Sequence, residues 1–409
     1  MKILVICQHY WPEPYPLPDL CEELVRRGHT VDVVTDVPNY PMGVTYPGYR
    51  RGARRREEHN GVHITRTFTI ARRHNAVFRL LNYYSYAWSS SLHARRLPGG
   101  YDVVFANQTS PVMMASAAFA YARRHGVKVV LYCMDLWPAC LAAGGVGERS
   151  PVYRFFGRQA RRLYNLPDRV LITSQMFRDY LVTQHGVDDA KIAYLPQYAA
   201  AQFDALPPAD PGKPTVDLMF AGNVGAAQDL TTVLRAAELL RGEARLHWHI
   251  VGDGSELARL QALAAQKQLD CVHFHGRQPP EAMPRYYAMA DAMLVTLTAD
   301  RFISLTLPGK VQSYMAAGKP ILAAADGEIP RVIGAAQCGW CAPAGDAAAL
   351  ADAVRQFLHC PDKAQLGRSA RAYYEAHFTR RRFMDALERE LAACARQAGP
   401  DTAQKGGLP

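Results

Sequence analysis

The stretch Leu305-Thr306-Leu307-Pro308-Gly309-Lys310-Val311-Gln312-Ser313-Tyr314-Met315-Ala316-Ala317-Gly318-Lys319-Pro320-Ile321-Leu322 decides the fold of the second half of this chain. Its Pro-Gly turn predicts the start of a short helix that Gly318 ends, and Pro320 leads into an apolar strand at 321–325. Lys310 then lies in the first helical turn, where backbone amides are unpaired and the helix dipole is positive. This arrangement predicts a phosphate site that needs no metal. A lysine that is simply exposed at a helix start is the alternative, and the spacing leaves both open.

Two glycine-containing loops precede this stretch. Gly222, Asn223 and Gly225 follow an apolar strand at 218–221 and precede a helix at 230–240, while Gly252 and Gly254 follow a strand at 247–251. Glycines between a strand and a helix allow backbone amides to approach a phosphate. Tight turns also use glycine, so the loops are weak evidence by themselves.

The N-terminus begins with a strand, helix and strand at 1–7, 17–27 and 31–35. Such a unit builds a parallel sheet whose binding sites lie at the carboxyl ends of the strands. We therefore expect the loop that contains His9 to line a crevice. A structural role for His9 is the alternative.

A carboxylate follows another apolar strand, at 127–132. A buried acidic residue is costly unless it is paired or used, so Asp135 ranks highest among the carboxylates of the first half. Asn107 and Gln108 follow the neighbouring strand at 102–106.

Composition and charge limit the class of protein. The 409 residues are 49% hydrophobic, enough for the cores of two or three domains, and no apolar run reaches the roughly 18 residues that span a bilayer. The start also lacks a signal-peptide cleavage region, so we expect a cytoplasmic protein. Residues 1–205 carry 25 Lys and Arg against 16 Asp and Glu, which is +9 of the formal +10. No nucleic-acid-binding module is recognisable, and we predict no nucleic-acid partner.

The segment 76–97 combines aromatic and apolar residues at near-helical spacing with arginines at both flanks. Aromatic residues between cations are typical of the lipid headgroup layer, so we predict contact with an anionic membrane surface. A helix packed on the core with a charged rim is the alternative.

Cysteines and histidines give no clear cofactor site. The nine cysteines are scattered, which favours reduced thiols, and Pro343 and Gly345 close behind Cys338-Gly-Trp-Cys341 predict a plain turn there. His247 with His249 and His273 with His275 alternate onto strand faces, but no third ligand has compatible spacing. We predict no metal and no cofactor.

The quoted stretch resembles the donor-domain signature of family 4 retaining glycosyltransferases. The resemblance is closest to the subgroup that builds O-antigen and capsule, including N-acetyl-L-fucosamine transferases, and it extends over nearly the whole chain. It implies an α/β GT-B fold, with two Rossmann-like domains whose parallel sheets face a central cleft and a C-terminal helix that crosses back to the first domain. The implied domains are an acceptor-binding domain at 1–205, a donor-binding domain at 206–379, and a crossover helix and tail at 380–409. Residues 205–214, rich in Pro, Ala and Asp, read as the linker.

The resemblance also assigns residues. Lys310 and Asp135 are implied as catalytic. The implied donor-binding residues are Gly222, Asn223, Gly225, Gly252, Gly254, Arg277, Arg301, Thr306, Pro308, Gly309, Gln312 and Ser313. The implied acceptor-binding residues are His9, Trp11, Glu13, Asn107, Gln108 and Trp137. The chain departs from the family pattern at Leu305, Ser313 and Ala139, where relatives carry glutamates.

The implied function is metal-independent transfer of a sugar from a UDP-sugar to a polyprenyl-diphosphate-linked saccharide, with retention of configuration, in surface polysaccharide synthesis. The donor sugar is expected to be an acetamido sugar such as N-acetyl-L-fucosamine, and the enzyme to associate peripherally with the cytoplasmic face of the inner membrane. Two alternatives stay open. One is a nucleotide-sugar epimerase of the same fold, and the other is a non-catalytic subunit that binds a sugar nucleotide.

Overall fold

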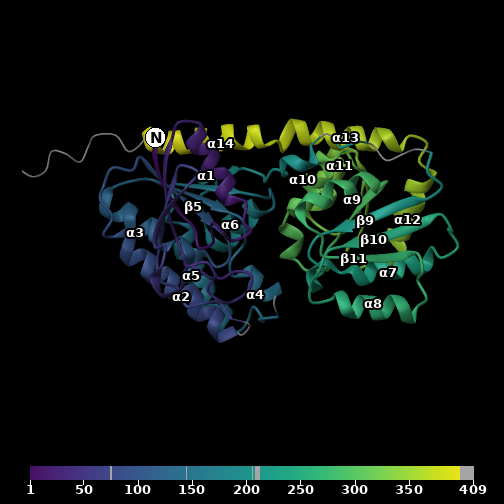
Figure 1. The fold of residues 1–409 in the computed structure, drawn as a ribbon, viewed down its shortest axis with the longest axis horizontal. Coiled ribbons are helices and arrows are strands. Elements are labelled where there is room, and N and C mark those ends of the chain that lie inside the picture. The colour runs from purple at the N-terminus through teal and green to yellow at the C-terminus, as the bar shows by residue number, and fades with distance from the viewer. Residues whose placement is uncertain (74–75, 144, 205, 208–211, 397–409) are drawn as a thin grey trace, which may run out of the picture. The chain divides into compact units, whose positions relative to one another are not determined.

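The computed structural model describes residues 1–409 except 74–75, 144, 205, 208–211 and 397–409 (Figure 1). Its contacts divide the chain into two compact units. Unit 1 comprises Met1–Thr173, Phe177–Leu195 and the chain from Met384 onward, and unit 2 comprises Ser174–Met176 and Pro196–Phe383. The division falls at 195/196, ten residues before the predicted boundary. Parts of the predicted linker and the tail after 396 lie outside the described residues.

Unit 1 is built on a sheet of eight strands in the described residues, in the order β3-β4-β2-β1-β5-β6-β7-β8. All neighbours are parallel except β3 and β4. The strands are β1 (Lys2–Ile6), β2 (Thr30–Thr35), β3 (Arg56–His59), β4 (Val62–Arg66), β5 (Val103–Gln108), β6 (Val129–Cys133), β7 (Arg169–Ile172) and β8 (Ile192–Tyr194). The central strands β5 and β6 are buried along their whole length, as expected where helices cover both faces of a parallel sheet.

The helices of unit 1 are α1 (Leu17–Arg26), α2 (Ala76–Ala94), α3 (Ser116–His125), α4 (Ala139–Ala143), α5 (Pro151–Tyr164) and α6 (Phe177–His185). Helix α2 packs along α3 (Figure 1). The residue type and position of Ser174 in the sequence predict that it caps the helix that ends at His185, and this prediction is wrong. Helix α6 begins at Phe177, and the Ser174 hydroxyl donates to the Leu305 carbonyl oxygen instead.

Unit 2 is built on a parallel sheet of six strands in its described residues, in the order β11-β10-β9-β12-β13-β14. The strands are β9 (Val216–Ala221), β10 (Leu246–Val251), β11 (Val272–Gly276), β12 (Ala292–Thr296), β13 (Ile321–Ala324) and β14 (Gly339–Ala342). The plain turn predicted at Cys338–Cys341 is therefore wrong, because Gly339–Ala342 pairs with β13 as an edge strand. A tight Gly339 makes that pairing possible, since a Cβ there would collide with the Ile321 carbonyl oxygen.

Helices cover both faces of this sheet (Figure 1). They are α7 (Leu230–Leu239), α8 (Leu257–Gln266), α9 (Met283–Met289), α10 (Gly309–Ala316), α11 (Glu328–Ala336), α12 (Ala347–His359) and α13 (Lys363–His377). Residues of α7, α8 and α12 form the core on one face, and residues of α9, α10, α11 and α13 form it on the other.

The last helix, α14 (Arg380–Arg396), belongs to both units, because its first four residues cluster with unit 2 and the rest with unit 1. Within unit 1, Arg27 contacts Asp385 and Glu388 at 2.7 and 3.0 Å, and Arg169 contacts Glu390 at 2.6 Å. The predicted crossing of the C-terminal helix to the first domain is confirmed. No described helix is both long and apolar enough to cross a membrane.

The strand orders fix where ligands can bind. In each sheet the chain runs outward in one direction, then returns to the centre and runs in the other. The order reverses between β1 and β5 in unit 1 and between β9 and β12 in unit 2. Ligand sites of open parallel sheets lie at the carboxyl ends of such strands.

Candidate active site

Lys310 lies in the first turn of α10, beside the reversal point of unit 2. Its ammonium lies 3.9 Å from the centre of the Phe220 ring and donates a hydrogen bond to the side-chain oxygen of Gln228. It forms no ion pair in the described part of the chain. Burial without a carboxylate partner lowers the pKa of Lys310 to about 7. Lys310 therefore has no anionic partner among the described residues.

The glycine loops after β9 and β10 pack against each other beside this lysine. Gly222 and Gly252 both have φ +145°, and a Cβ on Gly252 would collide with the Gly222 carbonyl oxygen. A Cβ on Gly222 would lie 3.4 Å from the Lys310 ammonium, so the lysine lies directly over the loop. The Asn223 side chain fills the space between Gly225 and Gly254, where added Cβ atoms would come within 2.6 and 2.9 Å of it.

Two amides of this loop are already used. The amides of Gly222 and Val224 donate to the carbonyl oxygens of Val251 and Asp253, each at 2.9 Å. These two amides are therefore not free to donate to a phosphate. The amides of Asn223 and Gly225 have no protein acceptor in the described residues.

The predicted donor-binding residues in and just before α10 differ in burial and in hydrogen bonding. Pro308 is the N-cap residue, Thr306 is half-buried just before it, and Gly309 is exposed. The Ser313 hydroxyl donates to the Gly309 carbonyl oxygen at 3.2 Å within the helix. Gln312 is fully buried, and neither its side-chain oxygen nor its nitrogen has a hydrogen-bond partner among the described residues.

The two arginines predicted for the donor site are both exposed. Arg277 is exposed immediately after β11. Arg301 is also exposed, and its guanidinium lies over the Phe302 ring at 4.5 Å. Among the predicted cations, Lys310 is the one whose packing against a glycine loop the structure shows.

Sequence reasoning missed two residues that position this group. Gln228 accepts the hydrogen bond from Lys310. The Tyr314 hydroxyl bonds to both the amide and the carbonyl oxygen of Ala221, each at 3.0 Å, and so fixes α10 against the residue that precedes Gly222. Tyr314 follows Lys310 by one helical turn, but only the packing of α10 reveals its partner.

In unit 1, Asp135 follows β6 and accepts a hydrogen bond from Ser110 at 2.9 Å. Burial raises the pKa of Asp135 above its ordinary value. Its carbonyl oxygen accepts from the buried Gln108 side chain at 3.0 Å. Asn107 is buried at the end of β5, and Trp137 is only 2% exposed, with no partner for its ring nitrogen in the described part of the chain. Asp135 and Gln108 are thus one hydrogen-bonded group at the carboxyl ends of β5 and β6.

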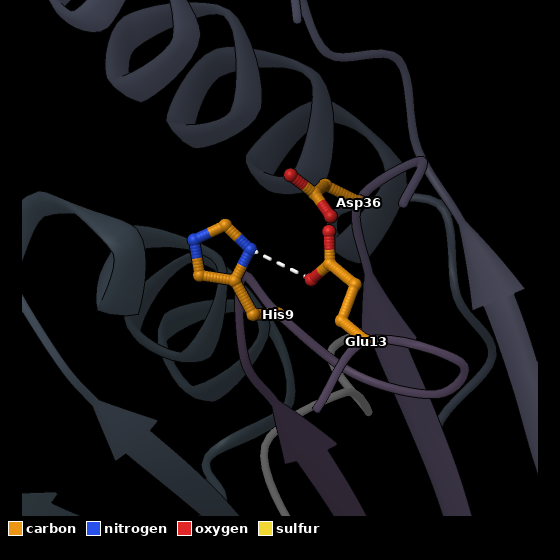
Figure 2. Close-up of side chains that lie close together, drawn as sticks. All are labelled: His9, Glu13 and Asp36. Carbon is orange, nitrogen blue, oxygen red and sulfur yellow. Dashed lines mark hydrogen bonds and ion pairs between the residues drawn. The ribbon is translucent and has the colours of Figure 1, made fainter. Parts of the chain in front are cut away.

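A second group of unit 1 contains His9, Glu13 and Asp36, all buried (Figure 2). One Glu13 carboxylate oxygen accepts from His9 at 2.8 Å, and the other accepts the amides of Asn39 and Tyr40, each at 2.6 Å. The His9 ring stacks on Tyr15 with centroids 5.1 Å apart. Glu13 therefore holds the imidazole and the loop after β2 in place. Trp11 lies apart from this group, stacked on His59 at 4.0 Å.

The same group has the composition of a metal site. The ligand atoms of His9, Glu13 and Asp36 lie within 4.8 Å of one another. However, both Glu13 oxygens already have donors, so hydrogen bonds account for this residue without a cation. Burial, and then the charge of Glu13, raises the pKa of Asp36 well above its ordinary value, which favours a retained proton. Sequence analysis missed Asp36, although it directly follows β2.

Comparison with known proteins agrees with this geometry. Residues 17–197 match the glycosyl transferase 4-like domain, and residues 209–373 match the domain of glycosyl transferases group 1. The chain is a glycosyltransferase. The first match ends where unit 1 gives way to unit 2, and the second contains Lys310 and both glycine loops.

Relatives and solved structures agree with this assignment. The glycosyltransferase is 26% identical to "Probable glycosyltransferase WbjE" of Pseudomonas aeruginosa, over 76% of this chain and 78% of that protein. It is 27% identical to WcaI of Escherichia coli K12, over 78% and 82% of the two chains. The structure of Anabaena HepE in complex with UDP superposes with a TM-score of 0.71 at 15% identity, covering 96% of this chain and 100% of that one. The fold is GT-B.

Proposed function

We propose that this glycosyltransferase uses a UDP-sugar and binds its diphosphate at Lys310. The observation that carries the proposal is the half-buried lysine without an anionic partner, placed over a glycine loop with two unpaired amides. A bound diphosphate would supply the missing charge, and the start of α10 adds a positive helix terminus. HepE, of similar fold, was solved with UDP, which supports the choice of nucleotide.

The chemistry follows from charge. As the bond between sugar and diphosphate breaks, negative charge grows on the leaving group, and Lys310 with the amides of Asn223 and Gly225 lies where it would be stabilised. We propose metal-independent transfer with retention of configuration. The departing diphosphate accepts the proton of the acceptor hydroxyl, so the protein supplies no separate base, and Asp135 orients the acceptor.

The proposed acceptor is a saccharide linked to a polyprenyl diphosphate, bound by unit 1 at the cytoplasmic face of the inner membrane. Support comes from the charge of +9 in residues 1–205 and from the large apolar residues that α2 exposes, including Val77, Leu80 and Trp88. The name of WcaI refers to colanic acid biosynthesis, which supports a role in surface polysaccharide synthesis such as O-antigen or capsule. The proposed sugar is an acetamido sugar, with N-acetyl-L-fucosamine first, from the resemblance of the Lys310 stretch.

The test is incubation of the protein with a panel of nucleoside diphosphate sugars and membrane-extracted lipid-linked acceptors, in EDTA. We expect acceptor-dependent release of UDP and one added sugar mass on the lipid. Donor conversion without acceptor would identify an epimerase, and binding without turnover would identify a non-catalytic subunit. Lys310→Met should lower turnover about a hundredfold or more, the scale of one lost electrostatic donor. The matched control is Lys213→Met, since Lys213 pairs with Asp217 and Asp291 away from the loops.

A further inference from the structure

A groove of about 930 Å³ lies in unit 1, among α2, α3 and α5. It reaches Lys128 and Asp168, which precede the amino ends of β6 and β7. Asp135 and His9 follow the carboxyl ends of strands, at the other edge of the sheet. The groove is therefore separate from the candidate active site, and its volume is in the range of small-molecule sites.

Large apolar side chains line the groove while remaining exposed to solvent. Tyr84 and Trp88 of α2 are 41% and 67% exposed, and Leu166 after α5 is 48% exposed. Phe119 of α3 and Leu163 of α5 also belong to the apolar lining. Exposed apolar surface gathered around a concavity is typical of a site for an apolar ligand.

Positive charge lies around the same lining. Arg95, Arg123 and Arg162 line the groove and are exposed, and none forms an ion pair within the described ranges. Lys128 is the exception, because it pairs with Asp168 at 2.8 Å. Three arginines without carboxylate partners favour an anionic group, and guanidinium matches a phosphate with paired hydrogen bonds.

We propose that this groove binds one molecule of an anionic phospholipid, with an acyl chain against Trp88 and Phe119 and the phosphate at the arginines. The apolar lining matches the chain, and the charge matches the headgroup. This proposal extends the proposed membrane association, and it rests on that association to bring the protein to phospholipids. Binding of a single lipid is nevertheless measured without a membrane and without sugar transfer, so the two proposals fail separately.

The experiment uses monomeric phosphatidylglycerol with short chains, below its critical micelle concentration, titrated into the full-length protein. Binding is followed by calorimetry and by tryptophan fluorescence. We expect saturable binding of one lipid per protein, with an affinity that rises up to about fourfold per added methylene. Phosphatidylcholine of the same chain length should bind at least about tenfold more weakly, because it lacks net negative charge. Inorganic phosphate should not compete at equal concentration.

Variants separate the groove from general adsorption. Arg123→Glu with Arg162→Glu should weaken binding at least about tenfold, and lysine at both positions should restore most of it. Trp88→Phe should bind but lose most of the fluorescence change, whereas Trp88→Asp should weaken binding. Arg50→Glu with Arg51→Glu, two exposed changes of equal total charge outside the groove, is the control. Circular dichroism confirms that each variant is folded. Three results would overturn the proposal. They are an affinity that does not depend on the length of the acyl chains, an equal loss of lipid binding in the control variant, and binding of the protein to vesicles but not to monomeric lipid.

Discussion

UDP binding should be coupled to protonation of Lys310. In the ligand-free protein, burial lowers the pKa of Lys310 from 10.5 to about 7. A bound diphosphate would favour the ammonium and return the pKa to at least its ordinary range. The folded, ligand-free protein would therefore lose this proton near neutral pH, while the complex would keep it. Above pH 7, each binding event must take up a proton, and affinity must fall as pH rises.

The magnitude follows from the two pKa values. With a free pKa of about 7, affinity should fall about 25-fold between pH 7.5 and 9, and the complex should take up about 0.9 proton at pH 8. The terminal phosphate of UDP is fully ionised throughout this range, because its pKa is about 6. The range therefore isolates the lysine from the ligand. Gln228 and Phe220, which contact the ammonium, do not titrate.

Calorimetry measures both quantities. Titrations of UDP in two buffers with different ionisation enthalpies give the number of protons taken up, and a pH series gives the affinity. Lys310→Arg is the matched variant, because arginine keeps its charge at all these pH values. Its affinity should change less than about twofold across the same range. A flat profile in the wild type, or an equal slope in Lys310→Arg, would refute the assignment of the diphosphate to Lys310.

Three further changes test the supporting structure, each by urea unfolding. Gly252→Ala should cost more than about 2 kcal/mol of stability, because its Cβ would collide with the Gly222 carbonyl oxygen, whereas Gly242→Ala, with nothing within 4 Å, should cost under about 0.5. Glu13→Ala should cost about 3 kcal/mol, since it leaves a buried amide, a partly buried amide and a histidine without an acceptor. An equally small loss of stability in Glu13→Ala and in the exposed control Glu58→Ala would contradict this role. The raised pKa of Asp36 means that the folded protein holds this proton more tightly than the unfolded chain, so wild-type stability is lost as pH rises from about 4. Asp36→Asn cannot titrate and should therefore gain relative to wild type between pH 4 and 7, and a constant difference would exclude the shift.

The Lys310 stretch shows how far local pattern reaches. Its turn, helix and strand follow from Pro308, Gly318 and Pro320, because these residues restrict the backbone wherever they occur. The burial and the contacts of each side chain do not follow from these residues. The sequence alone does not reveal that Gln312 is fully buried, or that the Ser313 hydroxyl donates to a carbonyl oxygen within the helix. Burial depends on which face of α10 packs on the sheet, and that depends on the whole unit.

Longer-range contacts explain the errors. Ser174 has the residue type of a helix cap, but its hydroxyl donates to Leu305, 131 residues away. Cys338–Cys341 has the composition of a turn, but an open sheet edge beside β13 accepts it as a strand. Asp36 is a candidate site residue only because the fold places its carboxylate near Glu13. In each case, a partner distant in sequence outweighed the local preference.

Helix α14 has a consequence for synthesis of the protein. Met384, Leu387 and Leu391 are fully buried, and they belong to the unit whose preceding segment ends at Leu195. At 5–20 residues per second, a ribosome needs roughly 10–40 s to translate the intervening stretch of about 190 residues. During that time the apolar surface of unit 1 that α14 covers is exposed. Unit 2 ends at Phe383, so it can fold before the rest of α14 is synthesised. The half of the enzyme that is translated first is therefore completed last.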